Sequence, residues 1–209
     1  MDARRFMLPG ALAVAGLGLW LLLAGFKNLL GFDTGSVGFA LLMLSAWSAL
    51  YAVRQLPRNA SELAISPGEW KAWIGTAFMA VAVTYFLAKI QVFQASSLLD
   101  NPDASIVGRN LVLLLVAWII VSAQIGARWK DRVQADERDL QIARHASGWG
   151  RGALTVALIG LALCLGFSPA DRLQWATFPM IANLLILALM VGCLFEYAAS
   201  AILHWLDRR

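Results

Sequence analysis

The chain has 209 residues, of which 60% are hydrophobic and only 14% are charged, and its mean hydropathy is +0.68. A soluble domain is roughly 45–50% apolar and about 25% charged, so an ordinary soluble fold is excluded. The net charge of +4 comes with no basic run and no RNA-binding motif, which argues against nucleic acid as a partner.

Six stretches almost empty of charge follow one another along the chain. Each is close to the ~20 residues that a helix needs to cross a membrane. Short connections between them favour antiparallel hairpins. We therefore expect an all-α bundle of about six transmembrane helices in three hairpins, forming a single domain over 1–209. The predicted spans cover about 8–26, 37–53, 70–93, 110–127, 153–167 and 175–203.

Lysine and arginine indicate how the chain is oriented. If the N-terminus is cytoplasmic, thirteen of the seventeen basic residues fall on the cytoplasmic side. The other four fall on the outer side, and they are Lys27, Lys89, Arg109 and Arg172. Cytoplasmic loops of membrane proteins carry the excess of Lys and Arg. Both termini are therefore predicted to be cytoplasmic.

Small residues recur along one helical face in two of the spans. Small residues allow transmembrane helices to approach closely. We expect these faces to be packing surfaces of a compact bundle, which we also expect to form a homo-oligomer among membrane lipids. The first set is Ala11, Ala15, Gly18 and Gly25, and the second is Ala153, Ala157, Gly160 and Cys164.

Glu196 is the only acidic residue well inside a predicted span. Ionisable groups at membrane depth are costly and usually face protein or a water-filled cavity. Gly192 lies four residues before Glu196 and Ser200 lies four residues after it, so the three residues share a small, polar face of the helix. One interpretation is an ion or solute path through Glu196 and Ser200, with Asn183 higher in the same span. The other is a carboxylate near the inner interface that pairs with a basic residue.

The segment 128–151 is predicted to be a cytoplasmic helical loop. It has no glycine or proline before Gly148, so the fourth span could continue into it as a helix. Its nearly balanced charge favours docking on protein over binding to lipid alone. The candidate residues for binding a protein partner are Asp136, Glu137, Arg138, Asp139 and Ile142.

No enzyme motif or metal-ligand spacing accompanies these features. Asp136, Asp139 and His145 do not follow a recognised metal pattern. The only two histidines, His145 and His204, are not paired as in H-E-x-x-H. We therefore predict no catalytic residue, no metal site and no cofactor.

One short motif resembles a known family. Asp136-Glu137-Arg138, then Ile142 and Ala146, directly precede an apolar span. This is similar to the D-E-R-x-x-x-I-x-x-x-A stretch between transmembrane hairpins in a group of small, uncharacterised bacterial membrane proteins. The resemblance covers spans three to six. It implies a bacterial inner-membrane protein. Members of the group often occur beside small helix-turn-helix regulators, which implies a regulatory or accessory role.

Three functional hypotheses follow. The leading one is a non-enzymatic accessory or regulatory protein that engages a partner through residues 128–147. The alternative is a small transporter or channel that uses Glu196. The least favoured is a membrane-embedded enzyme.

Overall fold

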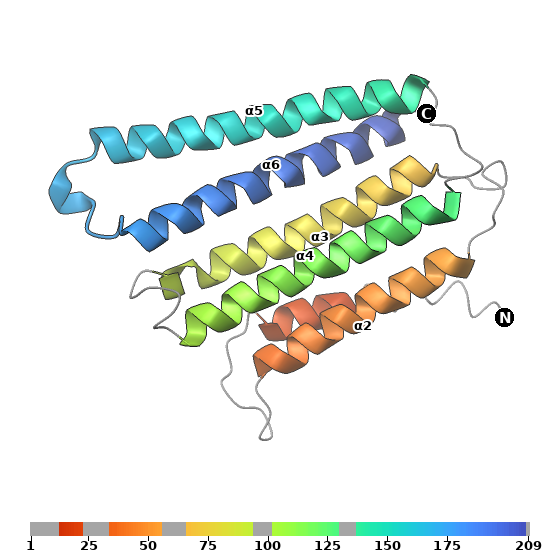
Figure 1. Ribbon diagram of the computed structural model, residues 1–209, viewed down its shortest axis with the longest axis horizontal. Helices are drawn as coiled ribbons and strands as arrows, with labels where there is room; N and C mark the ends of the chain where they lie inside the picture. The colour runs from red at the N-terminus through yellow and green to blue at the C-terminus, as the bar shows by residue number, and fades with distance from the viewer. Residues whose placement is uncertain (1–12, 23–33, 56–65, 94–101, 130–136, 208–209) are drawn as a thin grey trace. The chain divides into compact units, whose positions relative to one another are not determined.

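The computed structural model describes residues 13–22, 34–55, 66–93, 102–129 and 137–207, and all its regular elements in these ranges are helices (Figure 1). A helix over Ala13–Leu22 comes first. It is followed by α2 (Thr34–Gln55), α3 (Pro67–Lys89), the 3₁₀ helix η2 (Ile90–Phe93), α4 (Pro102–Trp129), α5 (Glu137–Phe167), the 3₁₀ helix η3 (Ala170–Arg172) and α6 (Phe178–Asp207).

Four helices are long and apolar enough to cross a membrane, which indicates a membrane protein. They correspond to the last four predicted spans. The first two predicted spans overlap shorter apolar helical stretches, Ala13–Leu22 and, within α2, Gly35–Ser48. The all-helical class is thus confirmed, while the count of six spans stays a prediction. The four long apolar segments are Gly68–Val92, Asp103–Gln124, Glu137–Phe167 and Phe178–Asp207.

Helix α5 begins earlier than the sequence suggested. Residues 137–151 form its first turns and continue without a break into the predicted fifth span. They do not belong to the fourth span, because α4 ends at Trp129. Glycine weakens a helix by only about 1 kcal/mol in its interior, and packing against α6 offsets this at Gly150. Residues 137–151 therefore belong to the helix of the predicted fifth span, and residues 130–136 lie outside the described residues, so a helical continuation of the fourth span beyond Trp129 stays a prediction.

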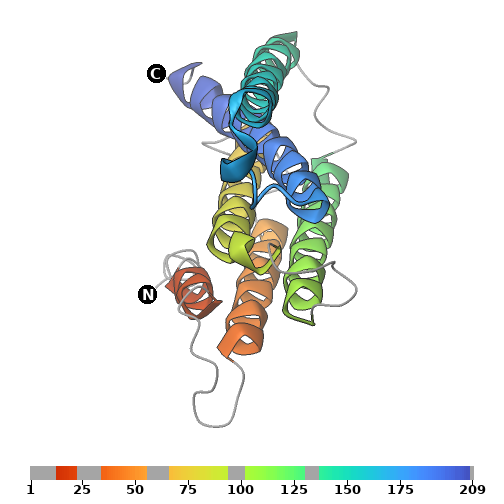
Figure 2. The same ribbon diagram turned by 90° about the vertical axis from the view of Figure 1, so that its left-hand side faces the viewer.

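Helices α5 and α6 form an antiparallel hairpin and lie side by side in both views (Figures 1 and 2). The two helices approach closely at Gly150. A Cβ atom there would lie 2.8 Å from Glu196 Cβ and 2.9 Å from the carbonyl oxygen of Gly192. Ile142 and Ala146, spaced four apart before Gly150, are also buried. This buried face of α5 is what holds the hairpin together.

Helix α3 also packs against α6, again in antiparallel register. The ring of His204 lies over Gly68, with two ring atoms 3.2 Å from where a Cβ atom would stand. Seven residues further along α3, Gly75 receives the ring of Tyr197. Tyr197 precedes His204 by the same seven residues, so two glycines of α3 accept two rings of α6 along one line. A Cβ atom at Gly75 would lie 2.6 Å from Tyr197 Cδ1, so any side chain at this position would collide with the Tyr197 ring.

The chain divides into two compact units, and one of the three divisions, between Leu111 and Val112, lies inside α4. One unit contains 65–111 and 135–209, and therefore α3, α5 and α6. In the other unit, the helix over Ala13–Leu22 meets α2 at a pair of glycines. A Cβ atom at Gly38 would lie 2.6 Å from the carbonyl oxygen of Gly18. Gly18 is thus a packing residue, as its place among the small residues of the first span predicted.

Candidate functional site at the end of the hairpin

Charged residues join the beginning of α5 to the end of α6. Arg138 forms an ion pair with the Asp207 carboxylate, and its Nη2 also donates a hydrogen bond to the Asp207 carbonyl oxygen at 2.8 Å. One residue further along α5, Asp139 Oδ1 lies 3.8 Å from His204 Nδ1. We call Arg138, Asp139, His204 and Asp207 the end clamp. The Arg138–Asp207 pair is largely exposed, and such pairs contribute at most about 1 kcal/mol, so the clamp orients the hairpin end more than it stabilises it.

The beginning of α3 adds a buried carboxylate beside the end clamp. Glu69 follows Gly68, the residue under the His204 ring, and is only 2% exposed. The Ser66 hydroxyl accepts a hydrogen bond from the Glu69 backbone N–H at 3.1 Å, which caps the helix. Trp73 Nε1 donates to Glu69 Oε1 at 3.4 Å, one turn along. The Glu69 carboxylate therefore belongs to the local hydrogen bonding of α3.

The structure divides the predicted partner-binding residues into two groups. Arg138 and Asp139 belong to the end clamp, and Ile142 is buried in the face of α5 that meets α6. Glu137 is exposed. Asp136 lies outside the described residues. Of the predicted set described by the structure, Glu137 and Arg138 are exposed, and Arg138 is held by its ion pair with Asp207.

The opposite face of α5 is open along its first turns. At 100° per residue, Glu137, Gln141 and Arg144 point away from the Ile142–Ala146 face. All three are exposed, and Leu140 beside them is 48% exposed. We call Glu137, Leu140, Gln141 and Arg144 the outer face. Of the predicted partner-binding residues, Glu137 belongs to this face, and binding of a partner by this segment stays a prediction.

The residues of the predicted ion path do not form one site. Asn183 and Glu196 are thirteen positions apart on α6, about 20 Å along a helix axis at 1.5 Å per residue. Asn183 is buried, and its Nδ2 donates to the carbonyl oxygen of Pro179 in its own helix at 2.8 Å. Glu196 is exposed on one side and touches Gly150 on the other, while Ser200 is half-buried. The small, polar face of α6 at Gly192 and Glu196 therefore contacts α5.

The described ranges contain no candidate metal-binding site. These contain no group of three or more His, Cys, Asp or Glu side chains placed to hold a metal ion. His145, one of the three weighed as ligands, has Nδ1 2.9 Å from the carbonyl oxygen of Gln141. A carbonyl only accepts, so Nδ1 carries the hydrogen in this contact.

Three members of the site were not predicted, namely Glu69, His204 and Asp207. Glu69 had a local signal, because Ser66-Pro67-Gly68-Glu69 has the S-x-x-E spacing of a helix cap. His204 had none, since its contacts with Asp139 and Gly68 depend on the register of two helix pairs. No pattern within α6 indicates which helices flank it.

No protein-family model, curated protein or solved structure matches this chain. The resemblance carried by Asp136-Glu137-Arg138, Ile142 and Ala146 therefore stays a prediction.

Proposed function

We propose that this chain is a non-enzymatic accessory or regulatory protein of the bacterial inner membrane, which binds a protein partner through the outer face at the start of α5. In this proposal the chain crosses the membrane six times with both termini in the cytoplasm. The observation that carries it is the continuity of α5 from Glu137 to Phe167, with its first turns clamped to α6 and the outer face exposed.

The length of α5 supports a projecting segment. Its 31 residues extend about 46 Å at 1.5 Å per residue, against a hydrocarbon core of about 30 Å. Counting about 20 residues back from Phe167 reaches Gly148. All five charged residues of α5 lie before or within a turn of this point, and they are Glu137, Arg138, Asp139, Arg144 and Arg151. The first eleven residues, 137–147, therefore lie outside the apolar layer.

The composition of the outer face suits a protein partner. Leu140 stands between Glu137 and Arg144, so one apolar side chain is bordered by charges of both signs. Protein interfaces typically combine an apolar centre with a polar rim. The end clamp keeps the backbone under this face helical and in place, which lowers the entropy cost of binding.

Transport through Glu196 is the weaker proposal. Glu196 is level with Gly150, close to the end of the apolar part of α5, so its carboxylate lies near the membrane interface. The nearest of the other candidates, Ser200, lies further toward the cytoplasmic end of α6. Asn183 is about 20 Å away in the opposite direction. The described positions of these residues favour an interfacial carboxylate over a continuous polar path.

The partner hypothesis is tested by native mass spectrometry of the protein extracted gently from its own membranes. Wild type is expected to carry a stoichiometric protein partner. Glu137→Arg combined with Leu140→Asp is expected to reduce the bound fraction at least tenfold, because it reverses a charge and removes the apolar contact (a loss of about 1.4 kcal/mol or more). Arg138 is left intact, since reversing its charge would also break the ion pair with Asp207.

Asp171→Arg is the matched control, because it makes an acidic-to-basic change at an exposed position beyond the other end of α5. It should retain the partner. Equal partner binding by the double variant and wild type would contradict the proposal, as would a wild type that carries only lipid.

A further inference from the structure

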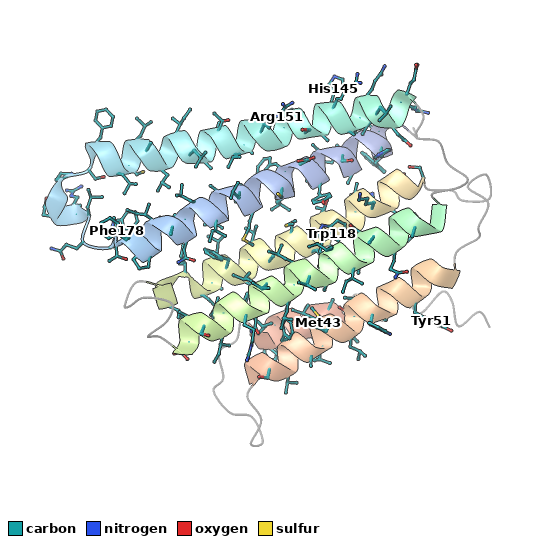
Figure 3. The ribbon with its side chains drawn as sticks, in the orientation of Figure 1. Met43, Tyr51, Trp118, His145, Arg151 and Phe178 are labelled. Carbon is teal, nitrogen blue, oxygen red and sulfur yellow. The ribbon has the colours of Figure 1, made fainter. Side chains whose placement is uncertain are left out.

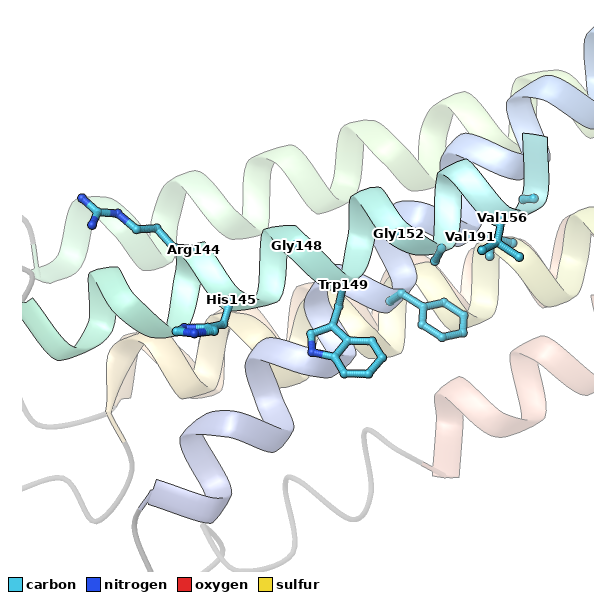
Figure 4. A pocket seen from close by; sticks show the side chains of 10 residues that line it. Arg144, His145, Gly148, Trp149, Gly152, Val156 and Val191 are labelled. Atoms are coloured by element: carbon cyan, nitrogen blue, oxygen red, sulfur yellow. The ribbon is translucent and has the colours of Figure 1, made fainter. Parts of the chain in front are cut away.

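An open groove runs along α5 on the flank between the outer face and α6 (Figure 4). Its volume is about 890 Å³. Figure 4 shows His145 and Trp149 extending from the same side of α5, with Val191 of α6 across the groove. Phe195 of α6 lines it as well. Of its ten lining residues, only Arg144 and His145 have ionisable side chains, and both lie at one end.

The alternating glycines of α5 explain why the groove exists beside a tightly packed hairpin. Gly148 and Gly152 are four apart and share a face, whereas Gly150 points to the opposite side. Gly150 receives Glu196 and Gly192 of α6. A Cβ atom at Gly148 or Gly152 would meet nothing within 4 Å. Gly150 therefore allows α5 to pack closely against α6, whereas Gly148 and Gly152 leave a trough in the protein surface.

The groove has the length of a single membrane leaflet. From Arg144 to Ala157 it covers thirteen residue steps, about 20 Å along the helix. Half of a bilayer with its headgroups is about 20–22 Å thick. The groove stops near the middle of α5's apolar stretch, and its charged end lies where that stretch meets water. Trp149, which is 65% exposed, stands at the depth that tryptophan prefers in membranes.

The distribution of charge matches one class of lipid. In the membrane placement proposed above, on which this step rests, Arg144 and His145 are at headgroup level. No acidic residue lines the groove. Basic pockets between helices on the cytoplasmic side bind anionic headgroups. Below this level the lining is glycine, alanine, valine and aromatic rings, which can contact acyl chains.

We infer that the groove lined by Arg144, Trp149, Gly152 and Phe195 binds an anionic phospholipid of the adjacent leaflet. Its phosphate lies beside Arg144 and His145, and an acyl chain lies over Gly148 and Gly152. The site shares Arg144 with the outer face, but Glu137 and Leu140, which carry the proposed partner contact, do not line the groove. The bound lipid would fill the flank of α5, whose most apolar 18-residue stretch is only 6% buried by the protein itself.

A second copy of the chain is the competing occupant, because glycines four apart often mediate helix contacts in membranes. The groove favours a lipid for two reasons. It covers one leaflet and not the whole span, and its basic end would face the same basic end in a symmetric dimer that placed the two grooves together.

The test uses the full-length protein in detergent, titrated with phosphatidylglycerol or phosphatidylcholine and followed by native mass spectrometry. Wild type is expected to retain phosphatidylglycerol at least tenfold more tightly than phosphatidylcholine. Arg144→Glu should remove most of this preference, since each basic residue near an anionic surface contributes about fivefold and the reversal changes the charge by two. Gly152→Leu should block both lipids by filling the trough without affecting the fold, because nothing lies within 4 Å of its Cβ position.

Two matched controls accompany these variants. Arg172→Glu makes the same charge reversal in η3, and Gly160→Leu makes the same glycine replacement beyond the groove, also with nothing within 4 Å. Both should bind phosphatidylglycerol as wild type does. The inference is overturned if wild type binds the two lipids equally, or if Gly152→Leu retains phosphatidylglycerol. It is also overturned if Gly152→Leu abolishes a dimer while leaving lipid binding unchanged, which would identify a second copy as the occupant.

Discussion

Gly150→Leu is expected to lower the free energy of unfolding by about 3 kcal/mol and to loosen the α5–α6 hairpin. The Cβ atom alone would lie 2.9 Å from the carbonyl oxygen of Gly192 and 2.8 Å from Glu196 Cβ. Backbone atoms cannot rotate away as the end of a flexible side chain can. Overpacking typically costs about 1–3 kcal/mol, and the backbone contact places this variant at the upper end.

Gly160→Leu is the control for this prediction, since it makes the same change in the same helix with open space around the Cβ position. Its stability should stay the same or rise slightly, because leucine favours a helix over glycine by less than about 1 kcal/mol. Thermal unfolding in detergent, followed by tryptophan fluorescence, measures both. Equal melting temperatures for the two variants would show that α5 and α6 do not meet at Gly150.

Phe86→Ala is expected to destabilise the protein by about 3 kcal/mol. Phe86 in α3 is 1% exposed and is among the largest fully buried side chains of the described chain. Truncating a buried Phe leaves a cavity and typically costs about 3–5 kcal/mol. The lower end applies because, in a membrane, lipid replaces water around an unpacked helix and reduces the hydrophobic part of the cost.

Phe178→Ala is the matched control, because Phe178 is 92% exposed at the start of α6 (Figure 3). Its melting temperature should stay within a degree or two of wild type. A Phe86→Ala protein as stable as Phe178→Ala would contradict the burial of Phe86 in the protein interior.

The helical class and the four long spans could be predicted from the sequence because length and apolar composition decide them locally. The packing face of the fifth span could not. Of the predicted face, Ala153 and Ala157 are half-buried while Gly160 and Cys164 are exposed, and Gly150, which was not in the predicted set, makes the close contact with α6. Both glycines satisfy the same small-residue rule. Only the position of α6 distinguishes them, and that position depends on contacts between helices.

The candidate site shows the same division between local and tertiary information. The segment around Glu137–Arg138 could be recognised by its charge and its lack of helix breakers. Which of its residues point inward could not be, because the Arg138–Asp207 pair joins positions 69 apart in the chain. Without the hairpin register, a residue of the end clamp cannot be told from one of the outer face.

The projection of α5 into the cytoplasm is tested most directly by cysteine accessibility. Gln141→Cys and Ile159→Cys are placed separately in a chain whose two native cysteines are replaced by Cys164→Ser and Cys193→Ser. A membrane-impermeant maleimide is then applied to intact spheroplasts and to inverted membrane vesicles. We expect labelling of position 141 in inverted vesicles only, and no labelling at position 159, which lies in the apolar layer, in either preparation. Labelling of position 141 in intact spheroplasts would contradict the proposed orientation, and its absence from both preparations would contradict a projecting outer face.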